Sequence, residues 1–304
     1  MKRGISEIVK IAREAGSVVP GFNIPYLPMM APVVQALRDA RTCGLIMVAR
    51  LEWTKFAAKS LLAIRDEYER TKDERFTRLH LDHVPAIDED GLVVDYMDIL
   101  DQAVRAGYDS VMFDGSRLPL EGNIAGTRRV VDMAHAAGVP VEGELGAVFG
   151  HEAVSMPPYE ELFANGKGFT DPLDARRFVE ETRVDWLSVA VGSVHGAISA
   201  ARSKKKLAAR INIEHLEKLR QAAGVPLVLH GGTGIPRHYV LDAIRHGIAK
   251  INVATAIRQP YEAQRGSSTE KAEIAVYETV RRIVREEFAI ENSADLLNPC
   301  GGAA

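Results

Sequence analysis

The sequence has little cysteine: only Cys43 and Cys300 occur in 304 residues. Two cysteines this far apart argue against a disulfide framework and against a metal site built from clustered thiolates. The chain also lacks an apolar run of the roughly 20 residues that a membrane-spanning helix needs. Its first stretch, MKRGISEIVKIAREAG, carries charges throughout and has no apolar core of the kind found in secretory signals. We therefore expect a cytoplasmic protein with no membrane partner.

A surplus of basic residues is missing as well. The chain has 38 Lys and Arg against 41 Asp and Glu, and its formal net charge is -3. We therefore expect no nucleic-acid partner, and we interpret the lysine run at 204–206 as a local, solvated loop. What is present is typical of a globular protein: 46% of residues are hydrophobic and 26% are charged.

Eight apolar runs of strand length alternate with amphipathic segments of helix length. Short glycine-containing stops separate several helices from the next strand, as in AAGVPVEGE and AAGVPLVLH. Repeated helix–glycine–strand units indicate parallel strands joined by crossover helices. The expected strands are 17–24, 44–50, 75–82, 110–115, 139–145, 186–192, 226–232 and 249–255.

This pattern predicts an α/β fold, a closed (β/α)8 TIM barrel that forms one domain over residues 1–304. A lead-in helix is expected at 5–15, and a C-terminal helical extension with a loose tail is expected over about 260–304. An open, doubly wound sheet is the alternative. It is disfavoured because no glycine-rich dinucleotide motif follows the first strand.

Polar residues gather at the predicted strand ends, which is where TIM barrels place their active sites. His83, His195 and His230 end or follow three different strands and can converge on one point, a donor set that suits catalytic zinc with an open position. Asp82, beside one of these histidines, is well placed to transfer a proton. Asp114 and Glu144 are interpreted as partners that orient the histidines, as an alternative metal position, or as acceptors of backbone hydrogen bonds.

Glycine-rich turns follow the sixth and seventh strands. HGGTG contains Gly231, Gly232 and Thr233, and GSVHG ends at Gly196. Such turns expose backbone N–H groups, and barrels often bind a phosphate between strands seven and eight. Together with NVAT, which ends at Thr255, they predict a small anionic substrate.

The motifs LHLDH, SVMFDGS, VEGELG, GSVHG, LVLHGGTGIP and KINVAT occur in a characteristic order and spacing up to about residue 257. In these motifs the chain resembles the class II, zinc-dependent ketose-bisphosphate aldolases, which include fructose- and tagatose-bisphosphate aldolases. The segment FTDPLDARRFVEETRVDWLSVAVGSVHG is particularly similar to the tagatose branch. The resemblance implies a lyase of carbohydrate metabolism that reversibly cleaves a phosphorylated ketose to dihydroxyacetone phosphate, or an analogue, and an aldehyde.

The resemblance also implies roles for individual residues. His83, His195 and His230 would hold Zn2+, Asp82 would be the acid/base at the cleaved bond, and Glu152 would move the proton at the donor carbon. The resemblance further implies a homodimer or homotetramer and a monovalent cation, Na+ or K+, beside the donor phosphate. The remaining implied contacts are Asn252 with the enediolate, Asn23 near the substrate, and Gly196, Gly231 and Thr233 around the phosphate with Thr255 nearby.

Some positions depart from the family pattern. Arg50 stands where the family commonly has serine, Ala254 where it often has an acidic residue, and AISAARSKKK follows GSVHG. We therefore expect aldolase chemistry on a substrate other than fructose bisphosphate. Two alternatives stay open: a carboxylated donor without phosphate, bound by Arg50, and a non-catalytic barrel subunit.

Overall fold

The computed structural model describes residues 3–146, 159–193 and 209–299. Eight parallel strands form a closed barrel in chain order, and β8 pairs with β1. The predicted (β/α)8 barrel is confirmed, and the open doubly wound sheet is wrong. The strands are β1 Val19–Asn23, β2 Gly44–Ala49, β3 Thr77–Pro85, β4 Ser110–Asp114, β5 Val141–Leu145, β6 Trp186–Val189, β7 Leu227–Leu229 and β8 Ile248–Val253.

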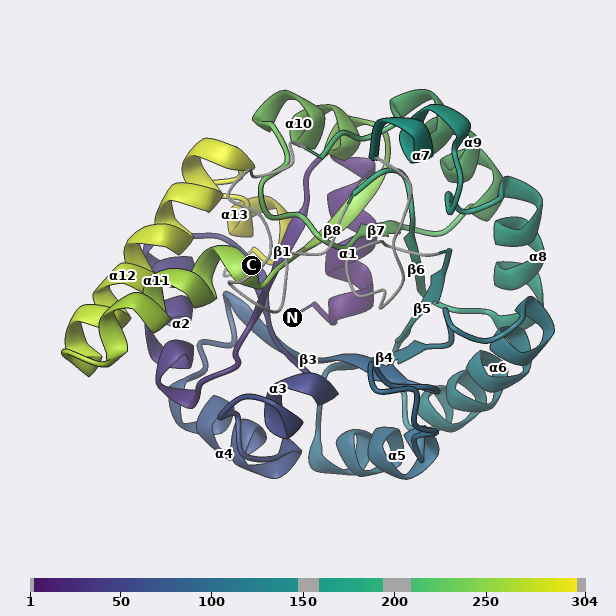
Figure 1. Ribbon diagram of the computed structural model, residues 1–304. Helices are drawn as coiled ribbons and strands as arrows, with labels where there is room; N and C mark the ends of the chain where they lie inside the picture. Colours follow the sequence, from purple (N-terminus) through teal and green to yellow (C-terminus); the bar gives the residue numbers. More distant parts are fainter. Residues whose placement is uncertain (1–2, 147–158, 194–208, 300–304) are drawn as a thin grey trace, which may run out of the picture.

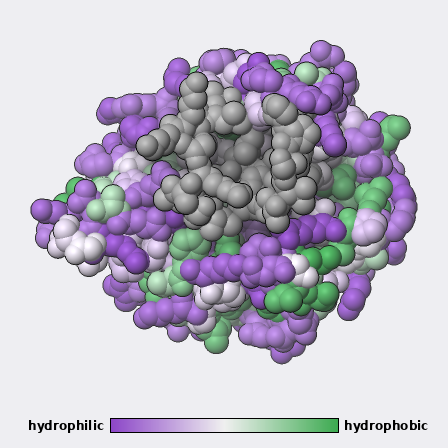
Figure 2. Space-filling view, viewed as in Figure 1, coloured by the Kyte–Doolittle hydropathy of each residue, from purple (hydrophilic) through white to green (hydrophobic). Residues whose placement is uncertain are grey.

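Helices surround the barrel (Figure 1). Their outer faces are mainly hydrophilic in the view of Figure 2, while their inner faces pack on the strands. Among the described residues, no helix is both long and apolar enough to span a bilayer. The surrounding helices are η1 Leu27–Met29, α2 Met30–Asp39, α3 Arg50–Thr54, α4 Leu61–Thr71, α5 Tyr96–Ala106, α6 Leu120–Ala136, α7 Tyr159–Asn165, α8 Pro172–Thr182, α9 Ile213–Ala223 and α10 Arg237–Arg245.

Additional helices lie at both ends of the chain. The lead-in helix is α1 Ile5–Glu14, which contacts β1 and β8. The extension begins at Thr255, earlier than expected, because α11 Thr255–Arg265 continues through Pro260. The α11–α12 pair projects from the barrel next to α2 in Figure 1. The extension continues with α12 Thr269–Arg282, the π-helical turn η2 Ile283–Glu287 and α13 Ala294–Leu297.

The start of the expected loose tail is in fact anchored. Asn298 is buried, and its Nδ2 donates to the Arg75 carbonyl oxygen at 2.9 Å. Its Oδ1 accepts a hydrogen bond from the Arg3 backbone N–H at 3.2 Å. The side chain of Asn298 therefore ties the C-terminal segment to both the N-terminus and the loop before β3.

The inside of the barrel is unusually polar. TIM barrels generally fill this space with layers of branched apolar side chains. Here several ionisable side chains are buried on the strands or directly after them: His80, Asp82, Glu142, Glu144, His230 and Lys250. Burying so many polar groups is costly unless each has a partner, so their arrangement points to a functional site at this position.

Candidate active site

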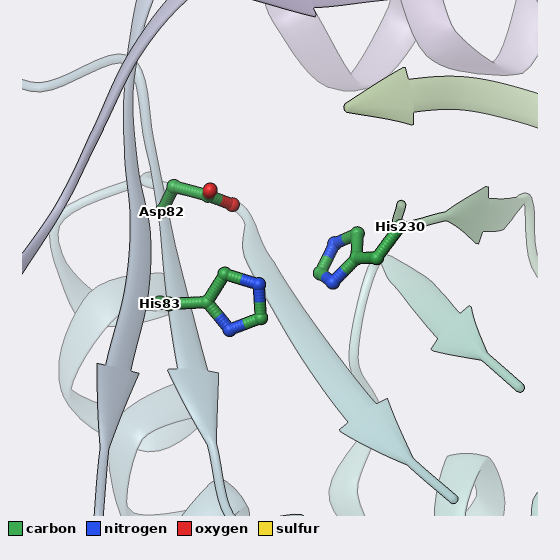
Figure 3. Close-up of side chains that lie close together, drawn as sticks. All are labelled: Asp82, His83 and His230. Carbon is green, nitrogen blue, oxygen red and sulfur yellow. The ribbon is translucent and has the colours of Figure 1, made fainter. Parts of the chain in front are cut away.

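The third strand contains an irregularity that shapes the site. Consecutive side chains of a regular strand point to opposite faces, yet the ligand atoms of Asp82 and His83 both lie near those of His230. In the β3–β4 pairing, β3 advances three residues, from Leu81 to Val84, while β4 advances two. Such a bulge redirects a side chain. It allows both residues to face His230, as Figure 3 shows.

Histidine and carboxylate groups converge at this point. The ligand atoms of Asp82, His83 and His230 lie within 4.8 Å of one another, and so do those of His83, Asp114 and Glu144. The rings of His83 and His230 have their centroids 4.5 Å apart. His83 Nδ1 lies 3.0 Å from Asp114 Oδ2. The described part of the predicted metal site is therefore brought together around His83.

The oxygen Oε2 of Glu144 tests whether these donors fit a metal ion. It lies 3.5 Å from His83 Nδ1 and 3.4 Å from His230 Nδ1. This oxygen is buried and makes no hydrogen bond within the described residues. A buried acceptor in this state costs free energy, which a cation placed between the three donors would recover. Nitrogen and carboxylate donors are the ligands that divalent transition metals prefer, so the set fits such an ion.

Asp82 is held in place by two amide groups. Asn23 Nδ2 donates to its Oδ2 and Asn252 Nδ2 donates to its Oδ1, both at 2.9 Å. Burial raises the pKa of Asp82, but the positive charges of His83 and Lys250 outweigh it and hold the pKa well below its usual range. The carboxylate is therefore ionised and fixed beside His83 and His230, and an ionised carboxylate is able to accept a proton.

Glu142 and Lys250 form a second layer below the site, and neither is among the predicted site residues. Glu142 Oε1 lies 2.9 Å from His230 Nε2, and its Oε2 lies 2.8 Å from Lys250 Nζ. Burial raises the pKa of Glu142, but the Lys250 charge is the main cause that lowers it, to about 2. The sequence does point to Lys250. It stands two positions before Asn252, and residues two apart in a strand lie on the same face of the sheet.

Glu52 is another buried carboxylate that the predictions omit. Its Oε2 accepts hydrogen bonds from the Ala49 N–H at 2.7 Å and from Asn23 Nδ2 at 3.4 Å. Burial is the main cause that raises the pKa of Glu52 to about 8, and the nearby charge of Asp82 adds to it. At neutral pH this side chain therefore keeps its proton. A glutamate in the first turn of a short helix gives no signal of such a role in the sequence.

His80, two residues before Asp82 on β3, is fully buried. Its Nδ1 lies 2.8 Å from Ser110 Oγ, and its Nε2 lies 3.8 Å from Asp82 Oδ1. Burial, with the Lys250 charge, lowers the pKa of His80 to about 3. The ring is neutral and fills the barrel beneath Asp82.

The predicted phosphate-binding turn follows β7. Gly231 has a φ of +68°, a conformation that favours glycine. A Cβ on Gly232 would lie 2.5 Å from Ile251 Cγ2 and 3.0 Å from the Asn252 carbonyl oxygen. This position therefore has no room for a side chain. Thr233 follows in the same turn, and Thr255 begins α11 at the same end of the barrel.

Arg50 begins α3 at the end of β2, and its Nη1 lies 3.2 Å from Asp88 Oδ2. The guanidinium thus already has one carboxylate partner, while 21% of the side chain stays exposed. Three predicted site residues, Glu152, His195 and Gly196, lie outside the described residues.

Comparisons with known proteins agree with this geometry. The sequence profile of class-II fructose-bisphosphate aldolase matches residues 4–296. The chain is 32% identical over 256 residues to a probable fructose-bisphosphate aldolase of Bacillus subtilis (strain 168), covering 83% of this chain and 80% of that protein. Most of both proteins is therefore aligned.

Solved structures are similar over almost the whole chain. The X-ray crystal structure of the YdjI aldolase from Escherichia coli K12 superposes with a TM-score of 0.75 at 26% identity and covers 97% of this chain and 100% of that one. A putative fructose-1,6-biphosphate aldolase from Coccidioides immitis has the same fold, with a TM-score of 0.74 at 24% identity and coverage of 95% and 96%. The observed barrel, the matching profile and the aligned relative thus lead to one conclusion: the chain belongs to the class-II fructose-bisphosphate aldolase family and is an aldolase, a lyase.

Proposed function

We propose that the protein is a zinc-dependent aldolase that reversibly cleaves a phosphorylated ketose to dihydroxyacetone phosphate, or a close analogue, and an aldehyde. The observation that carries this proposal is the convergence of the ligand atoms of Asp82, His83 and His230 within 4.8 Å. Two imidazoles beside an ionised carboxylate supply both a metal site and a proton acceptor. His195, by its place in the family motif, would complete the ligand set.

Zinc would act as a Lewis acid on the carbonyl and hydroxyl oxygens next to the bond that breaks. His83 and His230 would hold it. Asp114 would orient the His83 ring through Nδ1 and leave Nε2 to the metal, or Asp114 and Glu144 would offer a second metal position beside the Nδ1 atoms. A histidine-rich donor set with an open position is typical of catalytic zinc.

Asp82 would remove the proton from the hydroxyl group of the substrate during cleavage and return it during condensation. Both of its oxygens accept amide hydrogen bonds, which fix the carboxylate in one orientation. Its pKa lies below the usual range because the positive charges beside it outweigh the effect of burial, so it is ionised before the substrate arrives. With zinc on His83, the metal ion would supply the charge that the protonated ring supplies otherwise.

The phosphate of the donor would lie on the turn Gly231–Thr233. Gly231 has a positive φ, and Gly232 has no room for a Cβ. A turn of this kind lets backbone N–H groups come close to an anionic ligand. The name of the aligned relative from Bacillus subtilis, a probable fructose-bisphosphate aldolase, agrees with a phosphorylated ketose. A carboxylated donor bound by Arg50 is the second candidate, favoured by the exposed part of that guanidinium.

The test is metal analysis combined with a retro-aldol assay. The purified protein should contain about one zinc per chain and should release dihydroxyacetone phosphate from a panel of ketose phosphates. Chelation should abolish turnover, and zinc should restore it. His230→Ala should lose both the metal and the activity, whereas the control His246→Ala, at the end of α10, should keep both.

Full turnover after complete removal of the metal would contradict zinc dependence. Turnover of carboxylated ketones with no activity on any phosphorylated one would favour the second candidate instead. The predicted monovalent cation and the predicted homodimer or homotetramer are separate parts of the proposal. Activity measured with and without Na+ and K+, and light scattering, would test them.

A further inference from the structure

Lys250 is a charged side chain at the centre of the barrel, with an exposed fraction of 0%. Its Nζ lies 2.8 Å from Glu142 Oε2 and 2.7 Å from Asn252 Oδ1. A buried ammonium group is costly, and such groups are kept where they have a carboxylate partner and further acceptors. Lys250 makes no predicted contact with substrate or metal, so its position needs another explanation.

The contact with Asn252 fixes the orientation of that amide. An ammonium group can only donate, so the amide oxygen must face Lys250 and the amide nitrogen must face the other way. In that orientation Nδ2 donates to Asp82 Oδ1 at 2.9 Å. Rotating the amide by half a turn would place its NH2 group against the ammonium and its carbonyl oxygen against the carboxylate. Both new contacts would be repulsive.

The contact with Glu142 has a parallel effect on His230. Glu142 Oε2 accepts hydrogen bonds from Lys250 and from Trp186 Nε1, the latter at 2.6 Å. The carboxylate is therefore an acceptor on this side, and its Oε1 lies 2.9 Å from His230 Nε2. A neutral imidazole carries one N–H, so a proton on Nε2 leaves the lone pair on Nδ1. That nitrogen is the one that faces Glu144 Oε2 at 3.4 Å.

We propose that Lys250 is a positioning residue: its buried ammonium group sets the amide orientation of Asn252 and, through Glu142, the Nδ1 ligand form of His230. One cation thereby prepares two different parts of the site, the hydrogen bond on the proton acceptor and the donor atom for the metal. The inference rests on the proposed aldolase function for its kinetic consequence, but not for the tautomer or the metal affinity.

The first experiment replaces Lys250 by methionine, which keeps the length of the chain but removes the donor and the charge. Turnover, kcat, should fall at least roughly tenfold while KM changes little, because the side chain does not contact the substrate. Zinc affinity, measured by competition with a chelator, should fall, but by less than the roughly 10- to 100-fold typical for removing a direct partner of a ligand, because Lys250 acts through Glu142 and its lost charge partly offsets the effect. The control Lys218→Met, which breaks an exposed pair with Glu214 on α9, should change neither.

The second experiment excludes a loss of folding as the cause. The double variant Lys250→Met with Glu142→Gln leaves no unpaired buried charge, so its melting temperature should recover relative to Lys250→Met. If Lys250 orients Asn252, kcat should stay low in this double variant. Recovery of kcat together with stability would overturn the inference and leave Lys250 only the role of neutralising Glu142.

Nitrogen NMR of the histidine rings gives a readout that does not depend on activity. In the wild-type protein without metal, at a pH above the raised pKa of His230, the ring should show its single proton on Nε2, and Lys250→Met should show a mixture of tautomers. An unchanged tautomer with unchanged zinc affinity in a folded variant would overturn the inference. Should the wild-type protein cleave no ketose, the proposed function would fail, yet the tautomer and zinc measurements would still decide the role of Lys250.

Discussion

The charge of Glu52 should make the stability of the protein depend on pH in an unusual direction. Glu52 is buried in the first turn of α3, where it accepts hydrogen bonds from Ala49 N–H and Asn23 Nδ2. Burial, with the charge of Asp82, raises its pKa from the ordinary 4.5 to about 8. Replacing Glu52 by glutamine keeps the shape of the side chain and its acceptor oxygen but removes the titratable carboxyl group.

The sign follows from comparing the folded and unfolded chains. Between pH 4.5 and about 8 the unfolded chain has lost this proton while the folded chain keeps it, so folding takes up a proton. The contribution to stability then falls as pH rises, by at most about 1.4 kcal/mol per pH unit. Over the full interval the loss is no more than about 5 kcal/mol. Below pH 4.5 and above pH 8 the contribution is constant.

Urea unfolding of the chelator-treated protein between pH 5 and pH 8.5 measures this effect. Wild type and Glu52→Gln should have similar free energies of unfolding at pH 5, where glutamine resembles the protonated acid. By pH 8 the variant should be the more stable of the two by several kcal/mol, up to the limit of about 5. The control Glu270→Gln, at an exposed position of α12, should follow the wild type at every pH. Parallel curves for Glu52→Gln and wild type would refute the reasoning.

Two further substitutions test the substrate-binding end of the barrel. Gly232→Ala places a Cβ 2.5 Å from Ile251 Cγ2 and should raise KM for a phosphorylated ketose, measured against Gly266→Ala, where nothing lies within 4 Å. An unchanged KM would remove this turn from the phosphate site. Arg50→Met should raise KM by roughly 10- to 100-fold for substrates with a second anionic group. This factor corresponds to the free energy of one or two charged hydrogen bonds. Equal losses for substrates with and without that group would show that Arg50 binds Asp88 only.

The barrel itself could be predicted from the sequence because each unit repeats the same local signals. A β-branched run, an amphipathic segment and a glycine stop recur, and parallel strands with crossover helices are the architecture that satisfies all of them. The errors lie at the ends. Pro260 suggested a boundary, but α11 begins five residues earlier and includes it. The tail looked loose, yet Asn298 is buried by contacts to Arg3 and Arg75 that no local pattern encodes.

The site could be predicted in part, for a related reason. Histidines and carboxylates at strand ends stand out in the sequence because apolar strands seldom carry them. The closeness of Asp82 to both His83 and His230 depends on the bulge in β3, which appears only in the pairing of β3 with β4. Strict alternation would have turned one of the two consecutive residues away from the site.

Lys250 shows why the supporting residues were harder to identify than the donors. The role of a lysine within an apolar strand can be assigned only when its partners are known. The partners of Lys250 are Glu142, on β5, and Asn252, on the same strand as Lys250. Its charge is the counterpart of a cluster that would otherwise be strongly negative: Asp82, Asp114, Glu142 and Glu144 lie around His83 and His230. With the imidazoles in the neutral form that binds a metal ion, four carboxylates against one ammonium leave a negative surplus that favours a divalent cation at the donors. The same surplus explains why charges were placed inside a barrel whose interior is normally apolar.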